Sequence, residues 1–151
     1  MKILVCFDGS EQSYQAVKSA NEMALAYNAE EVTLVHVYPA KEASIWQAAN
    51  ESSGRIAREL SAHEKQELDK YLAITNLMSK AVSEFENRDT KVSKKILKGN
   101  PVQEITELAE KEGYDIIVMG SRGYGGVKKL MLGSVSNGVI QESKVNVLVV
   151  K

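Results

Sequence analysis

The amino-acid sequence predicts a three-layer α/β/α fold, in which helices cover both faces of a five-stranded parallel sheet. Short segments rich in strand formers alternate along the chain with longer segments of helical periodicity. The strand segments are almost continuously apolar, which is typical of parallel strands buried on both faces. Parallel neighbours need a crossover connection, and the usual five-strand arrangement puts strand 1 in the middle. We therefore expect the strand order 3-2-1-4-5 and a single domain over residues 1–151.

The first strand and first helix are predicted within residues 2–28. Residues 2–7, KILVCF, form an apolar run that the turn sequence DGS ends. Ser10 is a candidate N-cap for a helix whose apolar residues recur at helical spacing as far as Asn28. The one cysteine, Cys6, excludes an internal disulfide, and we interpret it as a small buried apolar residue within the strand.

A second strand and a long helix are predicted next. Residues 32–38, VTLVHVY, form the strand, in which we interpret His36 as a hydrogen-bonded residue rather than a catalytic base. Residues 40–54 lack clean periodicity and predict a loop. Its Trp46 either packs on the nearest apolar surface or folds over a ligand as a lid. Residues 56–85 carry apolar side chains along one face of a long helix.

The third strand leads into the helix with the clearest sequence signals. Residues 91–97, KVSKKIL, mix apolar residues with lysines, which indicates a strand at or near the sheet edge. Asn100 is a candidate N-cap, and Pro101 suits the first helical position. Gln103 stands where a capping-box glutamine would reach back, and Gly113 follows the expected helix end.

The last part of the chain contains a glycine-rich stretch between two strands. Residues 115–120, DIIVMG, predict the fourth strand, which enters residues 120–138 with six of the ten glycines of the chain. A short helix is predicted at 134–142 and a fifth strand, VNVLVV, at 145–150. A strand this apolar would be prone to aggregation if it were an open sheet edge. We therefore expect that either a partner chain or helices of the same chain cover it.

The loops after strands 1 and 4 are predicted to share one ligand crevice. In doubly wound sheets, ligands bind outside the carboxyl ends of the strands, where the strand order reverses. Asp8 would then face the glycine-rich stretch. Glycines and the helix start at 133–136 leave backbone N–H groups open to an anion such as phosphate. Neither the P-loop pattern G-x-x-x-x-G-K-[ST] nor the dinucleotide pattern G-x-G-x-x-G occurs there.

The spacing Gly120-x2-Gly123-x9-Gly133-Ser134, with Asp8 after the first strand and an apolar last strand, resembles the universal stress protein family. The resemblance covers essentially the whole chain. It implies an adenine nucleotide alpha hydrolase-like fold and ATP as the bound cofactor, with Mg²⁺ or Mn²⁺ carried by the nucleotide. The alternative for the glycines is a flexible surface loop without a ligand.

The resemblance also implies a role for each candidate site residue. Asp8 would lie beside the ribose and adenine, and the backbone of Val37 would meet the adenine. Asp8 has the alternative role of capping the turn that follows it, and both roles can coexist. The implied nucleotide-binding residues are Asp8, Val37, Met119, Gly120, Arg122, Gly123, Gly133, Ser134, Val135 and Ser136. No catalytic or metal-ligating residue is assigned.

The function implied by the resemblance is a nucleotide-responsive regulatory module of the stress response, with at most slow ATP hydrolysis. Residues 145–150 would pair two copies into a homodimer. Two alternatives stay open: a nucleotide-using hydrolase or nucleotidyl transferase, and a dimeric interaction scaffold that binds no nucleotide. The net charge of −1 gives no footprint for nucleic acid. Without a signal peptide or the roughly 18 apolar residues of a membrane helix, we expect a cytoplasmic protein.

Overall fold

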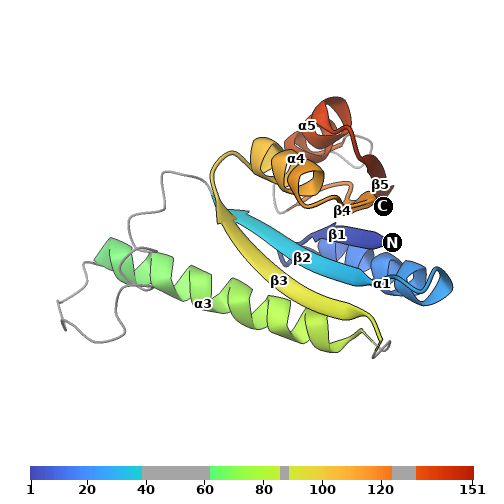
Figure 1. The fold of residues 1–151 in the computed structure, drawn as a ribbon. Coiled ribbons are helices and arrows are strands. Elements are labelled where there is room, and N and C mark those ends of the chain that lie inside the picture. Colours follow the sequence, from blue (N-terminus) through green and yellow to red (C-terminus); the bar gives the residue numbers. More distant parts are fainter. Residues whose placement is uncertain (39–61, 86–88, 124–131) are drawn as a thin grey trace.

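The structure, a computed structural model, describes residues 1–38, 62–85, 89–123 and 132–151. It confirms the expected fold class: five parallel strands form one sheet in the order β3-β2-β1-β4-β5, with helices on both faces (Figure 1). The predicted loop at 40–54, with Trp46, lies outside the described residues.

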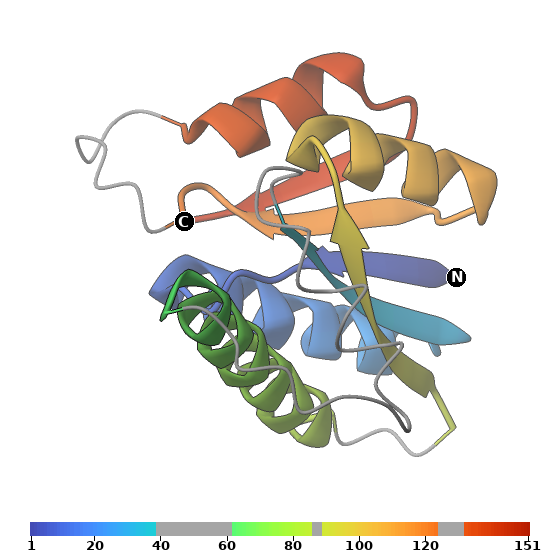
Figure 2. The same ribbon diagram turned by 90° about the vertical axis from the view of Figure 1, so that its left-hand side faces the viewer.

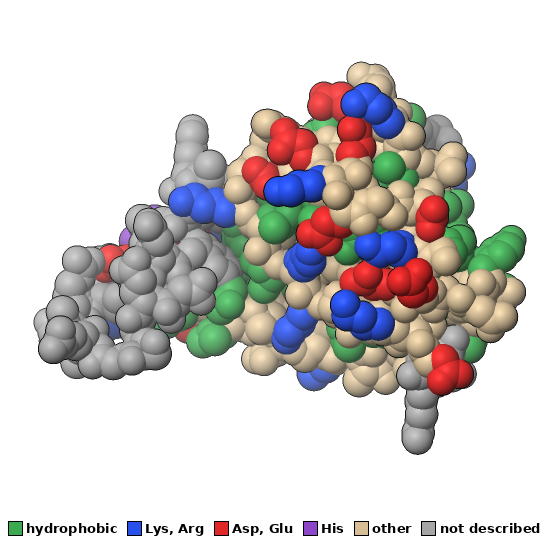
Figure 3. Space-filling model, in the orientation of Figure 1, with side chains coloured by type: hydrophobic (Ala, Val, Ile, Leu, Met, Phe, Trp, Pro, Cys, Tyr) green, Lys and Arg blue, Asp and Glu red, His purple; other side chains and the backbone are tan. Residues whose placement is uncertain are grey.

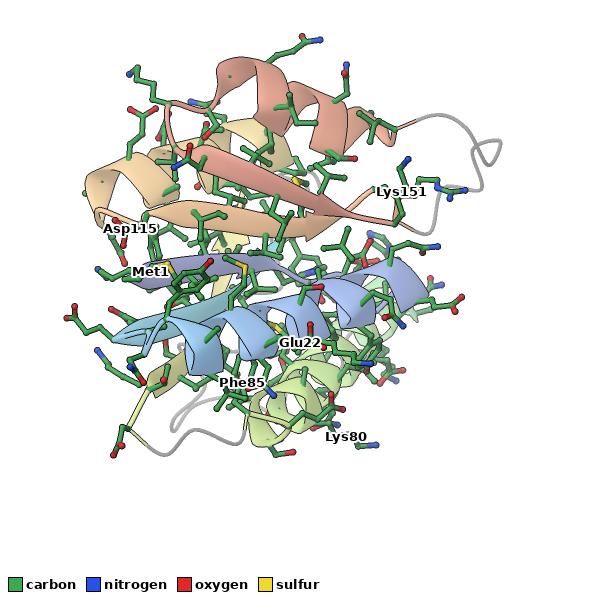
Figure 4. The ribbon with its side chains drawn as sticks, turned by 90° about the vertical axis from the view of Figure 1, so that its right-hand side faces the viewer. Met1, Glu22, Lys80, Phe85, Asp115 and Lys151 are labelled. Carbon is green, nitrogen blue, oxygen red and sulfur yellow. The ribbon has the colours of Figure 1, made fainter. Side chains whose placement is uncertain are left out.

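The five strands lie where the sequence predicts them, with small differences at their ends. Lys2 on β1 pairs with Glu31 on β2, and Ile3 pairs with Ile116 on β4, so β1 is central. The strands are β1 (Lys2–Cys6), β2 (Glu31–Tyr38), β3 (Lys91–Lys98), β4 (Ile116–Gly120) and β5 (Asn146–Val150). Figure 4 shows Met1 and Asp115 at one end of the sheet and Lys151 at the other. The carboxyl ends of the parallel strands therefore share the end near Lys151.

Within the described residues, four helices cover the sheet, α4 and α5 on one face and α1 and α3 on the other (Figure 2). They are α1 (Glu11–Ala26), α3 (Ala62–Ser83), α4 (Pro101–Lys111) and α5 (Ser134–Glu142). The predicted caps are confirmed, since Ser10 accepts from the N–H of Ser13, and the Asn100 side chain accepts from two N–H groups of α4. The capping box is wrong: the Gln103 amide donates forward to Glu107 at 2.8 Å.

The core consists of two apolar clusters, one on each side of the sheet. Because side chains alternate along a strand, Ile3 and Val5 of β1 pack toward α1 and α3, while Leu4 packs toward α4 and α5. All three side chains are completely buried. Burial on both faces explains why the strand segments are almost continuously apolar in the sequence.

The two sheet edges differ in charge. β3 is one edge, as its lysines predict, and two of these lysines pair with acidic side chains of neighbouring elements: Lys91 with Glu31 at 3.7 Å, and Lys95 with Glu112. On the face seen in Figure 3, acidic and basic side chains are interspersed rather than separated. β5 is the other edge, and its Leu148 is 36% exposed in a single chain. No described helix is long and apolar enough to cross a membrane.

Candidate functional site

All ten predicted site residues line one cavity of about 290 Å³ at the carboxyl end of the sheet. They come from the ends of β1, β2 and β4 and from the start of α5, which the parallel topology brings to the same end. The expected meeting of the loops after β1 and β4 is therefore present in the fold. The lining residues that the sequence analysis did not single out for the site are Cys6, Phe7, Ser13, Val35, His36, Pro101 and Ile105.

One wall of the cavity is apolar. Met119 of β4 and Val37 of β2 belong to the apolar cluster under α4 and α5, and Ile105 of α4 packs with them. The family resemblance implies both strand residues. Pro101 and Ile105 could not be identified from the sequence, because α4 lines the cavity only after the crossover connection places this helix over β2. This wall suits a flat apolar group such as a nucleobase.

The loop after β1 holds Asp8 in a fixed turn. Asp8 Oδ1 accepts from the N–H of Ser10 at 2.9 Å, and the N–H of Gly9 donates to Ser13 Oγ at 3.1 Å. Gly9 has φ of 83°, a left-handed conformation that glycine adopts without a steric penalty. The turn-capping role considered for Asp8 is therefore present. It uses one carboxylate oxygen and leaves Oδ2 on the side of Gly123.

The glycines of the motif make room for the chain itself, which sequence reasoning missed. A Cβ at Gly120 would lie 2.7 Å from Gln12 Cβ and 2.9 Å from its carbonyl carbon, so the end of β4 packs directly on α1. A Cβ at Gly123 would overlap Asp8 Oδ2. The sequence predicts instead that the missing side chains expose backbone amides to an anion. Nothing in the glycine spacing indicated these partners, because they lie more than one hundred residues away in the sequence.

The start of α5 brings backbone N–H groups to the cavity. Gly133 is the N-cap, with φ of −65° and no side-chain capping bond, and its own N–H donates to Ser121 O at 2.8 Å. The N–H groups of the first helical turn have no partner within the helix and carry the positive end of its dipole. Ser134, Val135 and Ser136 of this turn all line the cavity, and Arg122 is the one arginine or lysine among the described residues that line it.

Two titratable side chains on the sheet also line the cavity. Nδ1 of His36 lies 2.8 Å from the carbonyl oxygen of Phe7, so this nitrogen carries the hydrogen and Nε2 is the acceptor of the neutral ring. Burial lowers the pKa of His36, although the Phe7 carbonyl and the Asp8 charge oppose the shift. The interpretation of His36 as a hydrogen-bonded residue is confirmed.

Cys6 is half-buried in the same cavity. Burial first, and the charge of Asp8 second, raise the pKa of the Cys6 thiol to about 12. A thiol that stays protonated at neutral pH is a poor nucleophile. Cys6 therefore contributes an uncharged surface to the cavity wall, in agreement with its interpretation as an apolar residue.

Comparison with known proteins gives a consistent result over the whole chain. The family described as Universal stress protein family matches residues 1–151. Universal stress protein MJ0577 of Methanocaldococcus jannaschii is 37% identical, and the match covers 99% of this chain and 94% of that protein. Universal stress protein MJ0531 of the same organism is 33% identical, with coverage of 99% and 81%.

Solved structures show the same similarity. The structure of MJ0577 matches with a TM-score of 0.76 at 35% identity, covering 99% of this chain and 94% of that one. A universal stress protein in complex with cAMP has a TM-score of 0.64 at 24% identity, covering 100% and 96%. The universal stress protein from Archaeoglobus fulgidus in complex with dAMP has a TM-score of 0.66 at 21% identity, covering 100% and 98%. At these lower identities the likeness shows the fold.

Proposed function

The chain belongs to the universal stress protein family, and from this premise we propose that it binds ATP in the cavity at the carboxyl end of its sheet. Binding would make it a nucleotide-responsive regulatory module of the stress response, with residues 1–151 as a single domain. The observation that carries the proposal is the arrangement of the cavity. One apolar wall and one helix start with free N–H groups meet within a space of about 290 Å³.

The two parts of the cavity match the two ends of an adenine nucleotide. Val37 and Met119 would contact the base, with the Val37 backbone bonding to its edge. Asp8 Oδ2 would accept from a ribose hydroxyl, and the first turn of α5 would bind the phosphates together with Arg122. A volume of about 290 Å³ lies just below the range of roughly 300–1,000 Å³ typical of ligand sites. The base and ribose would fill it, with the phosphates at its mouth.

Two relatives support an adenine nucleotide as the ligand. A universal stress protein has been crystallised with cAMP and the one from Archaeoglobus fulgidus with dAMP, both on the same fold. Both ligands combine an adenine base with a phosphate group, so they need the same pair of surfaces that this cavity offers. We extend this to ATP because the α5 turn has several donors for a longer phosphate chain.

We propose a binding module with at most slow hydrolysis rather than an efficient enzyme. Phosphoryl transfer needs positioned metal ions and a group that orients the nucleophile. Among the described residues that line the cavity, Asp8 is the one carboxylate, and one of its oxygens already accepts from Ser10. Mg²⁺ or Mn²⁺ would accordingly arrive on the phosphates of the nucleotide.

We also propose that two copies pair through β5 into a homodimer. Among the described residues β5 pairs only with β4, and its Leu148 is an exposed large apolar side chain. Pairing of two edges would give the free backbone groups of β5 partners and remove this apolar area from water. A cytoplasmic location also belongs to the proposal and is supported by the single cysteine, which suits a reducing compartment.

The proposal is tested by titrating the nucleotide-stripped protein with ATP, ADP and AMP in a calorimeter. We expect ATP to bind, and to bind more tightly than AMP, because its additional phosphates reach the α5 turn. Absence of binding by all three nucleotides to folded protein would contradict the proposal and favour the interaction scaffold. Steady ATP turnover that Asp8→Ala abolishes would favour the hydrolase or transferase instead.

A further inference from the structure

The first turn of α5 is tied to the end of β4 through the carbonyl group of Ser121. This oxygen accepts from the N–H of Gly133 at 2.8 Å and from the Ser136 hydroxyl at 2.9 Å. Ser121 is itself anchored, because its N–H donates to Val150 O at the end of β5 at 2.7 Å. The carbonyl therefore has a fixed position, and two groups of α5 are held to it.

Ser134 and Ser136 look equivalent in the sequence but stand in different environments. Ser136 is 2% exposed, and its Oγ lies 2.9 Å from Ser121 O and 3.2 Å from Gly133 O. A hydroxyl group has one hydrogen, so the Ser136 hydroxyl cannot donate to these carbonyls and to a phosphate at once. Ser134 is exposed at the first position of the helix. Its hydroxyl can turn toward a ligand.

The contact between the helix start and the β4 end is tight. A Cβ at Gly133 would lie 3.3 Å from Ser136 Oγ, 3.4 Å from Arg122 Cα and 3.5 Å from Ser121 O. A substituent at Gly133 would thus press against the chain itself. Gly133 and Ser136 act together: the glycine lets the start of α5 approach the end of β4 closely, and the Ser136 hydroxyl donates to Ser121 O across this contact.

We propose that Ser136 is a positioning residue, whose hydroxyl holds the first turn of α5 against Ser121 so that the N–H groups of this turn face the cavity. This inference rests on the proposed nucleotide binding and assigns a different role to each serine. Ser134 donates to the phosphates, whereas Ser136 acts on them through the backbone of the turn. Removal of the Ser136 hydroxyl should therefore weaken phosphate binding without weakening binding of the nucleoside.

The test compares Ser136→Ala with the matched variant Ser134→Ala in the full, nucleotide-stripped chain. Without ligand, we expect Ser136→Ala to speed hydrogen exchange at the amides of Gly133 and Asn137, whose bonds to Ser121 O and Gly133 O close the turn. Ser134→Ala should leave both rates unchanged. In calorimetry, Ser136→Ala should lower ATP affinity about tenfold, the effect of one lost hydrogen bond, and change adenosine affinity less than about twofold.

A second pair of variants separates the hydroxyl from the shape of the side chain. Ser136→Thr keeps the hydroxyl and should retain slow exchange and the ATP affinity. The valine of Ser136→Val has nearly the same shape as threonine but no hydroxyl, so this variant should behave like Ser136→Ala. This pair also decides the question if the alanine variant does not fold.

Two results would count against different parts of the argument. Wild-type exchange together with a wild-type ratio of ATP to adenosine affinity in Ser136→Ala would overturn the role of Ser136. A wild-type protein that binds no adenine nucleotide would overturn the proposed function. In that case the exchange rates would still show whether the hydroxyl holds the turn.

Discussion

At the scale of single residues, the carboxylate of Asp8 connects the two loops that form the mouth of the cavity. One oxygen accepts from Ser10 within its own loop, and the other lies against Gly123 of the loop after β4. Neither oxygen can move freely, because the turn fixes one and the glycine backbone borders the other. Gly123 therefore determines where the carboxylate can stand.

Gly123→Ala should lower ATP affinity about tenfold, because the methyl group would overlap Asp8 Oδ2 and displace the carboxylate. The matched background is Asp8→Ala, in which the same substitution meets no carboxylate and should have little further effect. Calorimetry on the two single variants and the double variant gives the coupling. An equal loss in both backgrounds would show that the methyl group obstructs the ligand directly.

His36 makes stability depend on pH. Because burial holds its pKa in the folded chain below the usual 6.5, the unfolded chain binds a proton more readily as pH falls through 6.5. The His36 contribution is thus complete above that value and is lost below it. In urea unfolding, the free energy of unfolding of the wild type should fall between pH 7 and pH 5 relative to His36→Asn, whose amide can still donate to Phe7 O. His63→Gln on α3 serves as the control variant, and equal pH dependence of wild type and His36→Asn would refute the assignment.

At the scale of elements, β5 is the strand whose environment one chain leaves incomplete. Its two faces differ, because Val147 packs into the cluster under α4 and α5 while Leu148 is exposed. A charge at Val147 would disturb the core as well as the edge. A charge at Leu148 tests the edge alone.

Leu148→Lys should convert the proposed homodimer into a monomer, because two lysines would repel each other where two apolar side chains would meet. Light scattering at several concentrations measures the mass. Leu72→Lys on α3, at another exposed leucine, is the control and should leave the mass unchanged. A Leu148→Lys protein that keeps the wild-type dimer mass would show that β5 is not the interface.

Most elements could be predicted because their signals are local. Asn100 starts α4 because its side chain accepts from N–H groups that the helix leaves without a partner, and Pro101 suits the first position because it has no N–H group. Both effects involve only residues that are close in the sequence. Gln103 shows the limit of the same reasoning. The side-chain amide of Gln103 could bond either back to the start of the helix or forward to Glu107. In the structure it donates to the Glu107 carboxylate.

At the scale of the whole molecule, the proposed nucleotide would link separate segments, since the end of β1, the end of β4 and the start of α5 all line the cavity. Ligand binding to the folded state alone stabilises it by mass action. We expect ATP at about one hundred times its dissociation constant to raise the free energy of unfolding by about 2.7 kcal/mol. Urea denaturation with and without ATP measures the difference. GTP at the same concentration is the control, and an equal increase with GTP would contradict recognition of the adenine base.

The amino-acid sequence alone was enough to predict the alternation of strands and helices, the parallel sheet and the segments that carry the site. Each of these follows from local periodicity and from the few ways in which parallel strands can be connected. The contacts of each site residue could be seen only in the folded chain. It placed Gly120 against Gln12, Gly123 against Asp8 and the hydroxyl of Ser136 on Ser121, and it added His36 and Ile105 to the cavity. The physical reason is that these contacts join segments far apart in the chain, whose distances are fixed only when the sheet and its helices pack.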